Sequence, residues 1–358
     1  MEEKRSLREN PEGIFAFQWH ITDTCDQRCS HCYIFAENNT KPIVSMNIDQ
    51  MEEVLRKCEE FTAKLDMKPT FAITGGDPIL APDFWKLAEL LKSKGYTYAL
   101  MGNPFHLTPD VLKRLKDNGC IAYQMSIDGL EDTHDSIRKK GSFRKTIETI
   151  PMIVRSGIQS VIMMTISDIN YKELRGVMDA VEEAGADVFS FARYVPTSDE
   201  KSVGIPPHEF REVLDVFAKK RKESIRKGSF TSFTIKDHLL TLYYYEEGNF
   251  KPPEYKHIPG DHMPAGCHCA NATWAICSDG TMMACRRMES STLGNIFEDD
   301  LMDMWNEAKR RYRRYDEYEI CGKCKLSPWC RGCPAIAAAT NGSYLGRDPQ
   351  CWNIIEKD

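Results

Sequence analysis

The residues best suited to chemistry are three cysteines near the start of the chain, Cys25, Cys29 and Cys32. They follow an apolar run at residues 14–19 with the spacing C-x3-C-x2-C. Three thiolates on one loop can hold three irons of a cubic iron–sulfur cluster and leave the fourth iron open to another ligand. A zinc site is the alternative for this stretch, with His31 as the fourth ligand.

A second group of cysteines lies near the C-terminus. The sequence has 14 cysteines; nine lie between Cys267 and Cys351, and Cys58 and Cys120 stand alone. The charged N-terminus lacks the apolar core of a signal peptide, and a reducing cytosol disfavours disulfides. We therefore expect a cytoplasmic protein whose clustered cysteines bind metal. The two isolated thiols are predicted to be buried and structural.

Charge and hydropathy exclude two classes of partner. The formal net charge is −6 and the pI is about 5.9, which gives no reason to expect nucleic acid or an anionic membrane surface as a partner. No segment approaches about 18 uninterrupted apolar residues, so no membrane span is predicted.

The C-terminal cysteines have the spacing of a metal-binding module. Cys267 and Cys285 flank an Asp279-Gly280 turn, which predicts a small hairpin with a thiolate at each end. The run Cys321-x2-Cys324-x5-Cys330-x2-Cys333 follows, and Cys351 stands last. One such pair is a weak sign of metal, but this many cysteines in ordered sequence indicate a metal module strongly.

The elements that must position these residues alternate between strands and helices. The patterns predict strands at residues 14–19, 70–74, 96–101, 121–127, 160–166 and 188–194, and helices at 47–65, 82–94, 109–118, 143–156 and 171–184. This alternation indicates right-handed βαβ units around a parallel sheet. Six strands are too few for an eight-fold barrel, so we expect an α/β fold with a partial, open (β/α)6 TIM-like barrel. Residues 196–260 are predicted to form a helical bridge to the cysteine-rich end.

Chemistry in such folds gathers where the parallel strands end, and the sequence has polar residues there. Gly75 and Gly76 allow close backbone approach after the second strand, although an ordinary turn would explain them equally well. Asn103 follows the third strand. Ser126, Asp128 and Arg138 follow the fourth and suit a ribose and a carboxylate, although Asp128 also suits a turn before Gly129.

Together these motifs resemble those of the radical S-adenosylmethionine (SAM) enzymes. The resemblance rests on the cysteine array with Tyr33 after it, on Thr74-Gly-Gly-Asp-Pro78, similar to the family's GGEP element with Asp77 in place of glutamate, and on a Ser126-x-Asp128-Gly129…Arg138 segment. It departs at His31, where the family usually has an aromatic residue. The resemblance implies that the open iron binds SAM, whose cleavage gives a 5′-deoxyadenosyl radical. It further implies SAM contacts from Gly75, Gly76, Asp77, Ser126 and Arg138. Asn103 and Asp128 are further candidates for this pocket because they follow strands at the same edge of the sheet, although a purely structural role would explain each equally well.

The C-terminal module resembles the SPASM domain, which holds two auxiliary 4Fe–4S clusters. Carried over position by position, Cys267, Cys285 and Cys333 would bind the first cluster, with Cys269 or Cys277 as fourth ligand or an open iron. Cys321, Cys324, Cys330 and Cys351 would bind the second. Two residues separate Cys330 from Cys333 where the domain usually has three. Zinc in place of one cluster is the alternative.

The resemblance implies an enzyme that acts on a peptide. We expect maturation of a ribosomally made precursor peptide by a cross-link, such as a cysteine thioether. The alternatives are an anaerobic sulfatase-maturing enzyme, with Asp187 or Asp237 as conjectured base, an enzyme that modifies a tetrapyrrole or another small molecule, and a non-enzymatic cluster or zinc protein. Expected domains are a radical SAM barrel (1–195), the bridge (196–260) and a SPASM domain (261–358).

Two protein partners follow from the same resemblance. An electron donor such as flavodoxin or ferredoxin would reduce the clusters. About two dozen residues precede Cys25, too few for the winged-helix domain that binds leader peptides in many such enzymes. Either a separate leader-binding protein or the barrel and bridge helices are therefore expected to hold the precursor.

Overall fold

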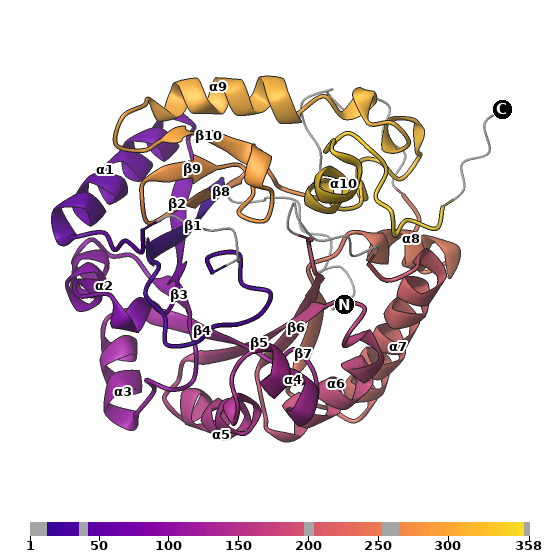
Figure 1. Ribbon diagram of the computed structural model, residues 1–358, viewed down its shortest axis with the longest axis horizontal. Helices are drawn as coiled ribbons and strands as arrows, with labels where there is room; N and C mark the ends of the chain where they lie inside the picture. Colours follow the sequence, from indigo (N-terminus) through magenta and orange to yellow (C-terminus); the bar gives the residue numbers. More distant parts are fainter. Residues whose placement is uncertain (1–12, 36–41, 197–203, 253–264, 354–358) are drawn as a thin grey trace.

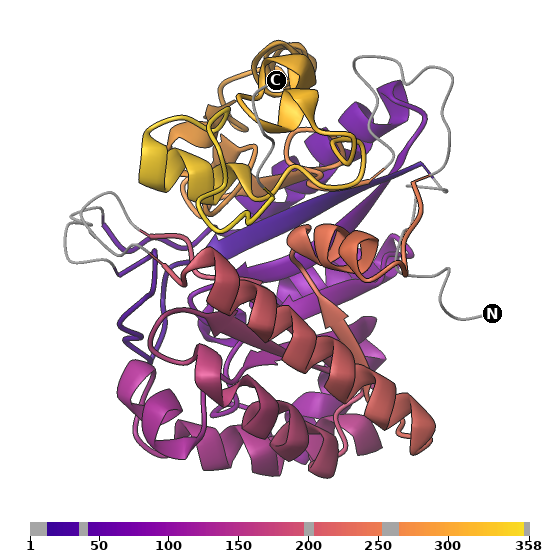
Figure 2. The ribbon, with the colours of Figure 1, turned by 90° about the vertical axis from the view of Figure 1, so that its right-hand side faces the viewer.

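One continuous sheet of ten strands organises the molecule (Figure 1). The computed structural model describes residues 13–35, 42–196, 204–252 and 265–353. The strand order is β10-β9-β8-β1-β2-β3-β4-β5-β6-β7. The sheet curves around a central space, with most of the helices on its outside (Figures 1 and 2). This is the partial barrel that the strand–helix alternation predicts.

The seven strands from β1 to β7 are parallel, and six of them are the predicted ones. They are β1 (Ile14–Thr22), β2 (Lys68–Gly75), β3 (Tyr98–Met101), β4 (Cys120–Ser126), β5 (Gln159–Ile166) and β6 (Val188–Arg193). The seventh, β7 (Ser232–Ile235), pairs with β6 and lies in the segment predicted to be only a helical bridge. That prediction was wrong on this point, because four residues with two apolar side chains give too short a pattern to recognise.

The helices around the barrel are α1 (Ile48–Lys64), α2 (Phe84–Ser93), α3 (Pro109–Asp117), α4 (Glu131–Ile137), α5 (Ser142–Arg155), α6 (Leu174–Glu183), α7 (Pro207–Arg226) and α8 (Leu239–Glu246). Helix α1 shows why the predicted ones form. Asn47 and Gln50 make a reciprocal capping box at its start, and its buried face includes Met51, Val54 and Cys58. Helix α4 escaped prediction because its seven residues are mostly polar. Cys58 and Cys120 are both fully buried, as predicted.

Strand β1 divides its side chains between the helix layer and the barrel interior. Phe15, Phe17 and Trp19 are fully buried, and Phe15 packs edge-on against Phe61 of α1. Since successive side chains alternate across a strand, His20 points to the opposite face, toward the centre of the barrel. His20 is only 1% exposed, so the centre is enclosed at this point.

The C-terminal module extends the same sheet. Strand β8 (Thr273–Ile276) pairs in parallel with β1, with Ala16 opposite Thr273. Strands β9 (Thr281–Met283) and β10 (Thr292–Asn295) continue it antiparallel, which confirms the predicted hairpin. Helices α9 (Leu301–Tyr312) and α10 (Pro334–Asn341) complete the module. Among the described residues no helix is long and apolar enough to cross a membrane.

Candidate functional site

The three-cysteine loop begins where β1 ends, at the carboxyl edge of the parallel strands. Cys25, Cys29 and Cys32 are all half-buried free thiols. The backbone N–H of Gln27 donates to the Cys25 sulfur over 3.4 Å, and Arg138 Nη1 lies 3.9 Å from the Cys29 sulfur. Burial raises the pKa of Cys25 to about 11, so a bound cation is needed to hold its thiolate at neutral pH. The loop thus suits a metal cluster.

Gly75 and Gly76, at the end of β2, pack against the backbone that leads into this loop. Gly76 N–H donates to Thr22 O (2.7 Å) and Asp77 N–H donates to Thr24 O (2.8 Å). A Cβ on Gly75 would lie 2.1 Å from Thr22 O, and one on Gly76 2.2 Å from Thr24 O. Larger residues are therefore excluded at both positions, because β2 must touch the backbone that leads into Cys25. That the pair also contacts SAM stays a proposal.

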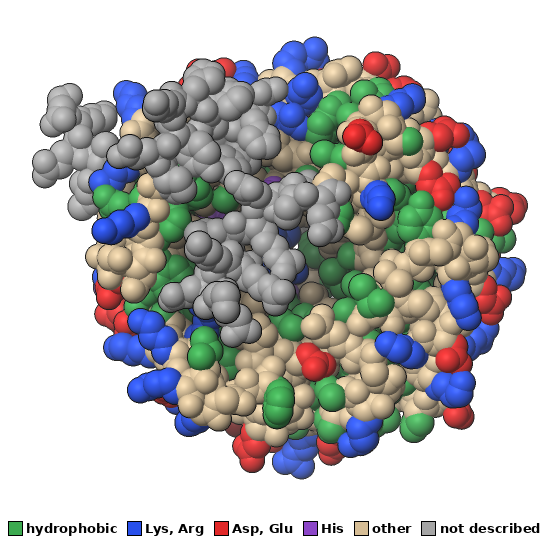
Figure 3. Space-filling view, turned by 180° about the vertical axis from the view of Figure 1, so that it is seen from behind, with side chains coloured by type: hydrophobic (Ala, Val, Ile, Leu, Met, Phe, Trp, Pro, Cys, Tyr) green, Lys and Arg blue, Asp and Glu red, His purple; other side chains and the backbone are tan. Residues whose placement is uncertain are grey.

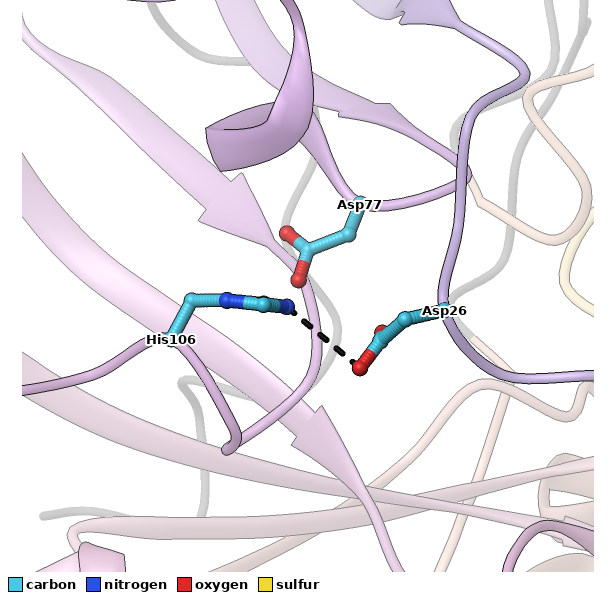
Figure 4. Close-up of side chains that lie close together, drawn as sticks. All are labelled: Asp26, Asp77 and His106. Atoms are coloured by element: carbon cyan, nitrogen blue, oxygen red, sulfur yellow. Dashed lines mark ion pairs between the residues drawn. The ribbon is translucent and has the colours of Figure 1, made fainter.

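Asp77 belongs to a polar cluster that fixes the start of the loop (Figure 4). Asp26, next to Cys25, accepts a hydrogen bond from Asn103 Nδ2 (2.8 Å) and lies 3.4 Å from His106 Nε2. The Asp77 side chain is fully buried and points toward these two residues. Burial raises its pKa to about 6. Asn103 therefore contacts the cysteine loop directly. Asp26 and His106 were not among the residues predicted from the sequence.

Asp128 and Arg138 form a second support on the other side of the loop. Asp128 is fully buried; its Oδ2 accepts from Arg138 Nε (2.5 Å) and its Oδ1 from Thr165 N–H (2.8 Å). His31 Nε2 lies 3.5 Å from the same carboxylate. Asp128 N–H donates to His134 Nδ1 (3.0 Å). Asp128 therefore does more than form a turn, because its carboxylate contacts β5, Arg138 and the cysteine loop.

Ser126 is the remaining predicted residue of this set. It ends β4 and is half-buried, close in sequence to Asp128. Its proposed contact with SAM follows from the resemblance. His31 faces Asp128, as described above.

Four C-terminal cysteines gather beside the β8–β9 hairpin. The Cys269 thiol makes hydrogen bonds with the thiols of Cys267 and Cys285, and these bonds shift the pKa of Cys267 and Cys285 downward. Cys333 interacts electrostatically with Cys267. Cys277 lies elsewhere, with its sulfur 3.7 Å from Met283 Sδ. We therefore propose Cys269, rather than Cys277, as fourth ligand of the first auxiliary cluster.

The other four cysteines line one pocket, which also has leucines in its wall. They are Cys321, Cys324, Cys330 and Cys351. Gly332 separates this set from Cys333 of the first set, with a left-handed φ of 58°. Its missing Cβ would lie 2.6 Å from Asp348. This left-handed conformation would let Cys330 and Cys333 bind different clusters, although only two residues separate them. We propose this pocket as the second auxiliary site.

The two conjectured bases lie in structural roles. Asp187 precedes β6, at the edge of the sheet opposite the cysteine loop, and accepts from Ser160 N–H (2.7 Å). Asp237 is 8% exposed, accepts from Arg193 Nε and caps Leu239 N–H. Each carboxylate therefore has structural partners, and the use of either one as a catalytic base stays a conjecture.

A cysteine loop at the carboxyl edge of an open parallel barrel, with further cysteine sets beside it, defines a cluster-bearing barrel enzyme. Residues 19–181 match the radical SAM superfamily, and residues 267–334 match SPASM, an iron-sulfur cluster-binding domain. The chain therefore belongs to the radical SAM enzymes with a SPASM domain. Its cofactors are 4Fe–4S clusters and SAM.

The proteins similar in sequence include heme synthases and a maturation protein. An AdoMet-dependent heme synthase of Methanosarcina barkeri is 26% identical, with 93% of this chain and 95% of that protein aligned. The sporulation killing factor maturation protein SkfB of Bacillus subtilis is 24% identical over 81% of this chain and 64% of its own length.

Solved structures confirm the fold. The structure of anSMEcpe with bound AdoMet superposes with a TM-score of 0.71 at 18% identity, covering 94% of both chains. Streptococcus suis SuiB bound to its precursor peptide SuiA gives a TM-score of 0.71 at 18% identity, over 95% of this chain and 76% of SuiB.

Proposed function

We propose that this enzyme matures a ribosomally made peptide by installing a cysteine thioether cross-link. The observation that carries the proposal is the outer edge of β7, the last strand in the sheet order. The N–H groups of Ser232 and Lys236 bond to Asp187 O and Phe191 O of the β6 side. The alternating N–H groups of Phe233 and Ile235 are therefore directed to the open edge. Such an edge can pair with an extended peptide.

The two halves of the enzyme meet at Tyr33 and Arg286. Tyr33 on the cysteine loop lies under Arg286, whose guanidinium carbon is 4.1 Å from the ring centroid. Arg286 adjoins Cys285 of the first auxiliary set. A substrate in this space would be within reach of both halves. The bound cofactors would supply the radical that removes hydrogen from an unactivated carbon, and the chain would hold and orient the peptide.

Relatives support a peptide substrate. SkfB is a maturation protein by name. SuiB has the same fold as this chain and binds a precursor peptide. An electron donor such as flavodoxin or ferredoxin is part of the proposal, as is recognition of the leader by a separate protein or by the barrel itself.

Co-expression with a cysteine-containing peptide encoded beside the gene tests this function. Forming a carbon–sulfur bond removes a hydrogen atom from carbon, a proton from the thiol and one electron, which returns to the electron-transfer chain. The peptide mass should therefore fall by two hydrogens per cross-link, and the thiol should no longer react with iodoacetamide. The anaerobic enzyme with dithionite and SAM should also yield 5′-deoxyadenosine. Active SAM cleavage with an unchanged peptide mass would reject the proposal.

Heme synthesis is the second candidate, because the relatives with that name align over almost the whole chain. It predicts that an iron porphyrin with carboxylate side chains changes mass when incubated with the reduced enzyme and SAM. The same assay run with both substrates separates the two candidates.

A further inference from the structure

The space between the cysteine loop and the first auxiliary set forms a central hollow with basic walls. His20, Tyr33 and Arg286 lie together here, and Arg287, next to Arg286 in the chain, interacts electrostatically with Lys236. The His20 and Tyr33 rings are 6.0 Å apart, and Arg286 covers Tyr33. Viewed from behind, the middle of the molecule is hollowed, and basic and histidine side chains are visible inside (Figure 3).

Among the described residues, no cation of the hollow forms a direct ion pair with a carboxylate, although Asp237 acts electrostatically on Arg287. Within the described part of the chain, Lys236, Arg286 and Arg287 make no ion pair with any carboxylate. Arg286 Nε is buried without a hydrogen-bond acceptor, and Arg287 Nη1 donates only to a backbone oxygen, Arg193 O, over 3.2 Å. Unpaired cations at close range repel one another and are costly to maintain. Their partner is expected to come from outside the chain.

Lys236 is exposed to water, and its pKa is lowered by the surrounding protein and then by Arg287. His20 is neutral for similar reasons, since burial and then Arg286 hold its pKa well below the usual value. Neither ring nitrogen of His20 has a partner, so the buried imidazole offers one donor and one acceptor to the hollow.

Only Arg287 among these three cations lies where it would balance the negative charge of the first auxiliary cluster. Arg287 interacts with Cys267, Cys285 and Cys333 and would balance negative charge there. Among the described residues, Arg287 is the charged group that shifts the pKa of Lys236, and Arg286 is turned toward Tyr33 and His20. These two cations are therefore available for a bound molecule.

We infer that Lys236 and Arg286 bind a carboxylate of the substrate, with the buried His20 imidazole contributing a hydrogen bond. The inference rests on the proposed function only in placing the substrate in this hollow. Acidic side chains or the C-terminus of a peptide carry such a group, and so do the side chains of a porphyrin. A guanidinium and an ammonium suit it by charge-assisted hydrogen bonds.

Binding to the intact enzyme, loaded with clusters and SAM under anaerobic conditions, tests the inference. One arm compares an oligoglutamate peptide with the matching oligoglutamine. The other compares coproporphyrin III with its tetraamide. Equilibrium dialysis is run for the wild type, Lys236→Gln, Arg286→Gln and the control Arg155→Gln, an exposed arginine on the outside of α5. Iron content shows whether each variant keeps its clusters.

We expect one carboxylate probe to bind, its neutral counterpart to bind at least about tenfold more weakly, and each hollow variant to lose about tenfold in affinity for the acid alone. Arg286→Lys should restore part of the loss, and Arg155→Gln should have no effect. The arm that binds identifies the source of the carboxylate. Equal binding of the neutral probe, unchanged affinity in both variants, or no binding of either acid would overturn the inference. Binding needs no turnover, so failure of the peptide mass assay leaves this result independent.

Discussion

Arg193 and Asp348 form a two-point ion pair that joins the barrel to the C-terminal module. Arg193 Nη1 and Nη2 each lie 2.8 Å from a different carboxylate oxygen of Asp348. Asp348 Oδ2 also accepts from Cys333 N–H over 2.7 Å. Both side chains are only 1% exposed. The arginine of β6 thus positions a candidate cluster ligand 140 residues farther along the chain.

Replacing Arg193 should destabilise the whole molecule. Arg193→Met leaves Asp237 and Asp348 buried without their cation, which should cost about 3 kcal/mol or more in the free energy of unfolding. Urea denaturation of the anaerobic enzyme measures the change. Arg56→Gln, which breaks an exposed pair with Glu60, should cost less than about 1 kcal/mol. Similar losses in the two variants would contradict the buried-pair interpretation.

Cys269 and Cys277 make opposite predictions for cluster content. Cys269→Ala should lower bound iron by as much as one cluster, about four irons per chain, because Cys269 bonds to two other thiols of the first set. Cys277→Ala should keep the wild-type iron content. Iron and sulfide analysis, with EPR of the reduced enzyme, provides the measurement. Iron loss in Cys277→Ala alone would reverse the assignment.

Arg138 should be required for the SAM-binding half. Arg138→Gln removes the partner of the buried Asp128 carboxylate and a donor near the Cys29 sulfur. SAM affinity should fall by about tenfold or more, with 5′-deoxyadenosine formation reduced in parallel. The matched control is Arg144→Gln, which removes an exposed pair with Glu131. An Arg138 variant with normal SAM affinity would show that the pair is only structural.

His134 should make stability depend on pH. Burial, and then Arg138, lower its pKa to about 4, and its Nδ1 accepts from Asp128 N–H. The unfolded chain takes up a proton near pH 6.5 and the folded chain does not, so stability falls as pH drops from about 6.5 toward 4. Melting temperatures from pH 5.5 to 7.5 should show a flatter profile for His134→Gln. Identical slopes would rule out this contribution.

The open edge of β7 can be blocked without breaking the sheet. Ile235→Pro removes an outward N–H and leaves the ladder to β6 intact. Cross-linking of the peptide should fall about tenfold, while 5′-deoxyadenosine formation without peptide stays normal. Ile235→Thr keeps the N–H and should behave like the wild type. Full activity in the proline variant would exclude pairing at this edge.

The sequence predicts those features that depend on a local pattern of apolar residues or on short intervals between cysteines. Six strands follow from apolar runs, and the cysteine sets follow from their intervals. The pairing of Asp26 with His106 could not be predicted, because the two residues lie in different loops and meet only when β3 and β1 share a sheet. The choice between Cys269 and Cys277 also depends on the folded hairpin, since either is near enough along the chain.

The parallel pairing of β8 with β1 has a consequence for electron transfer. The strand that leads into the radical-forming loop is hydrogen-bonded directly to the strand between Cys269 and Cys285. The tunnelling distance between the two centres is therefore set by backbone geometry, rather than by docking of separate bodies. Electron exchange between them should be insensitive to solvent viscosity, unlike transfer that waits for a hinge to close.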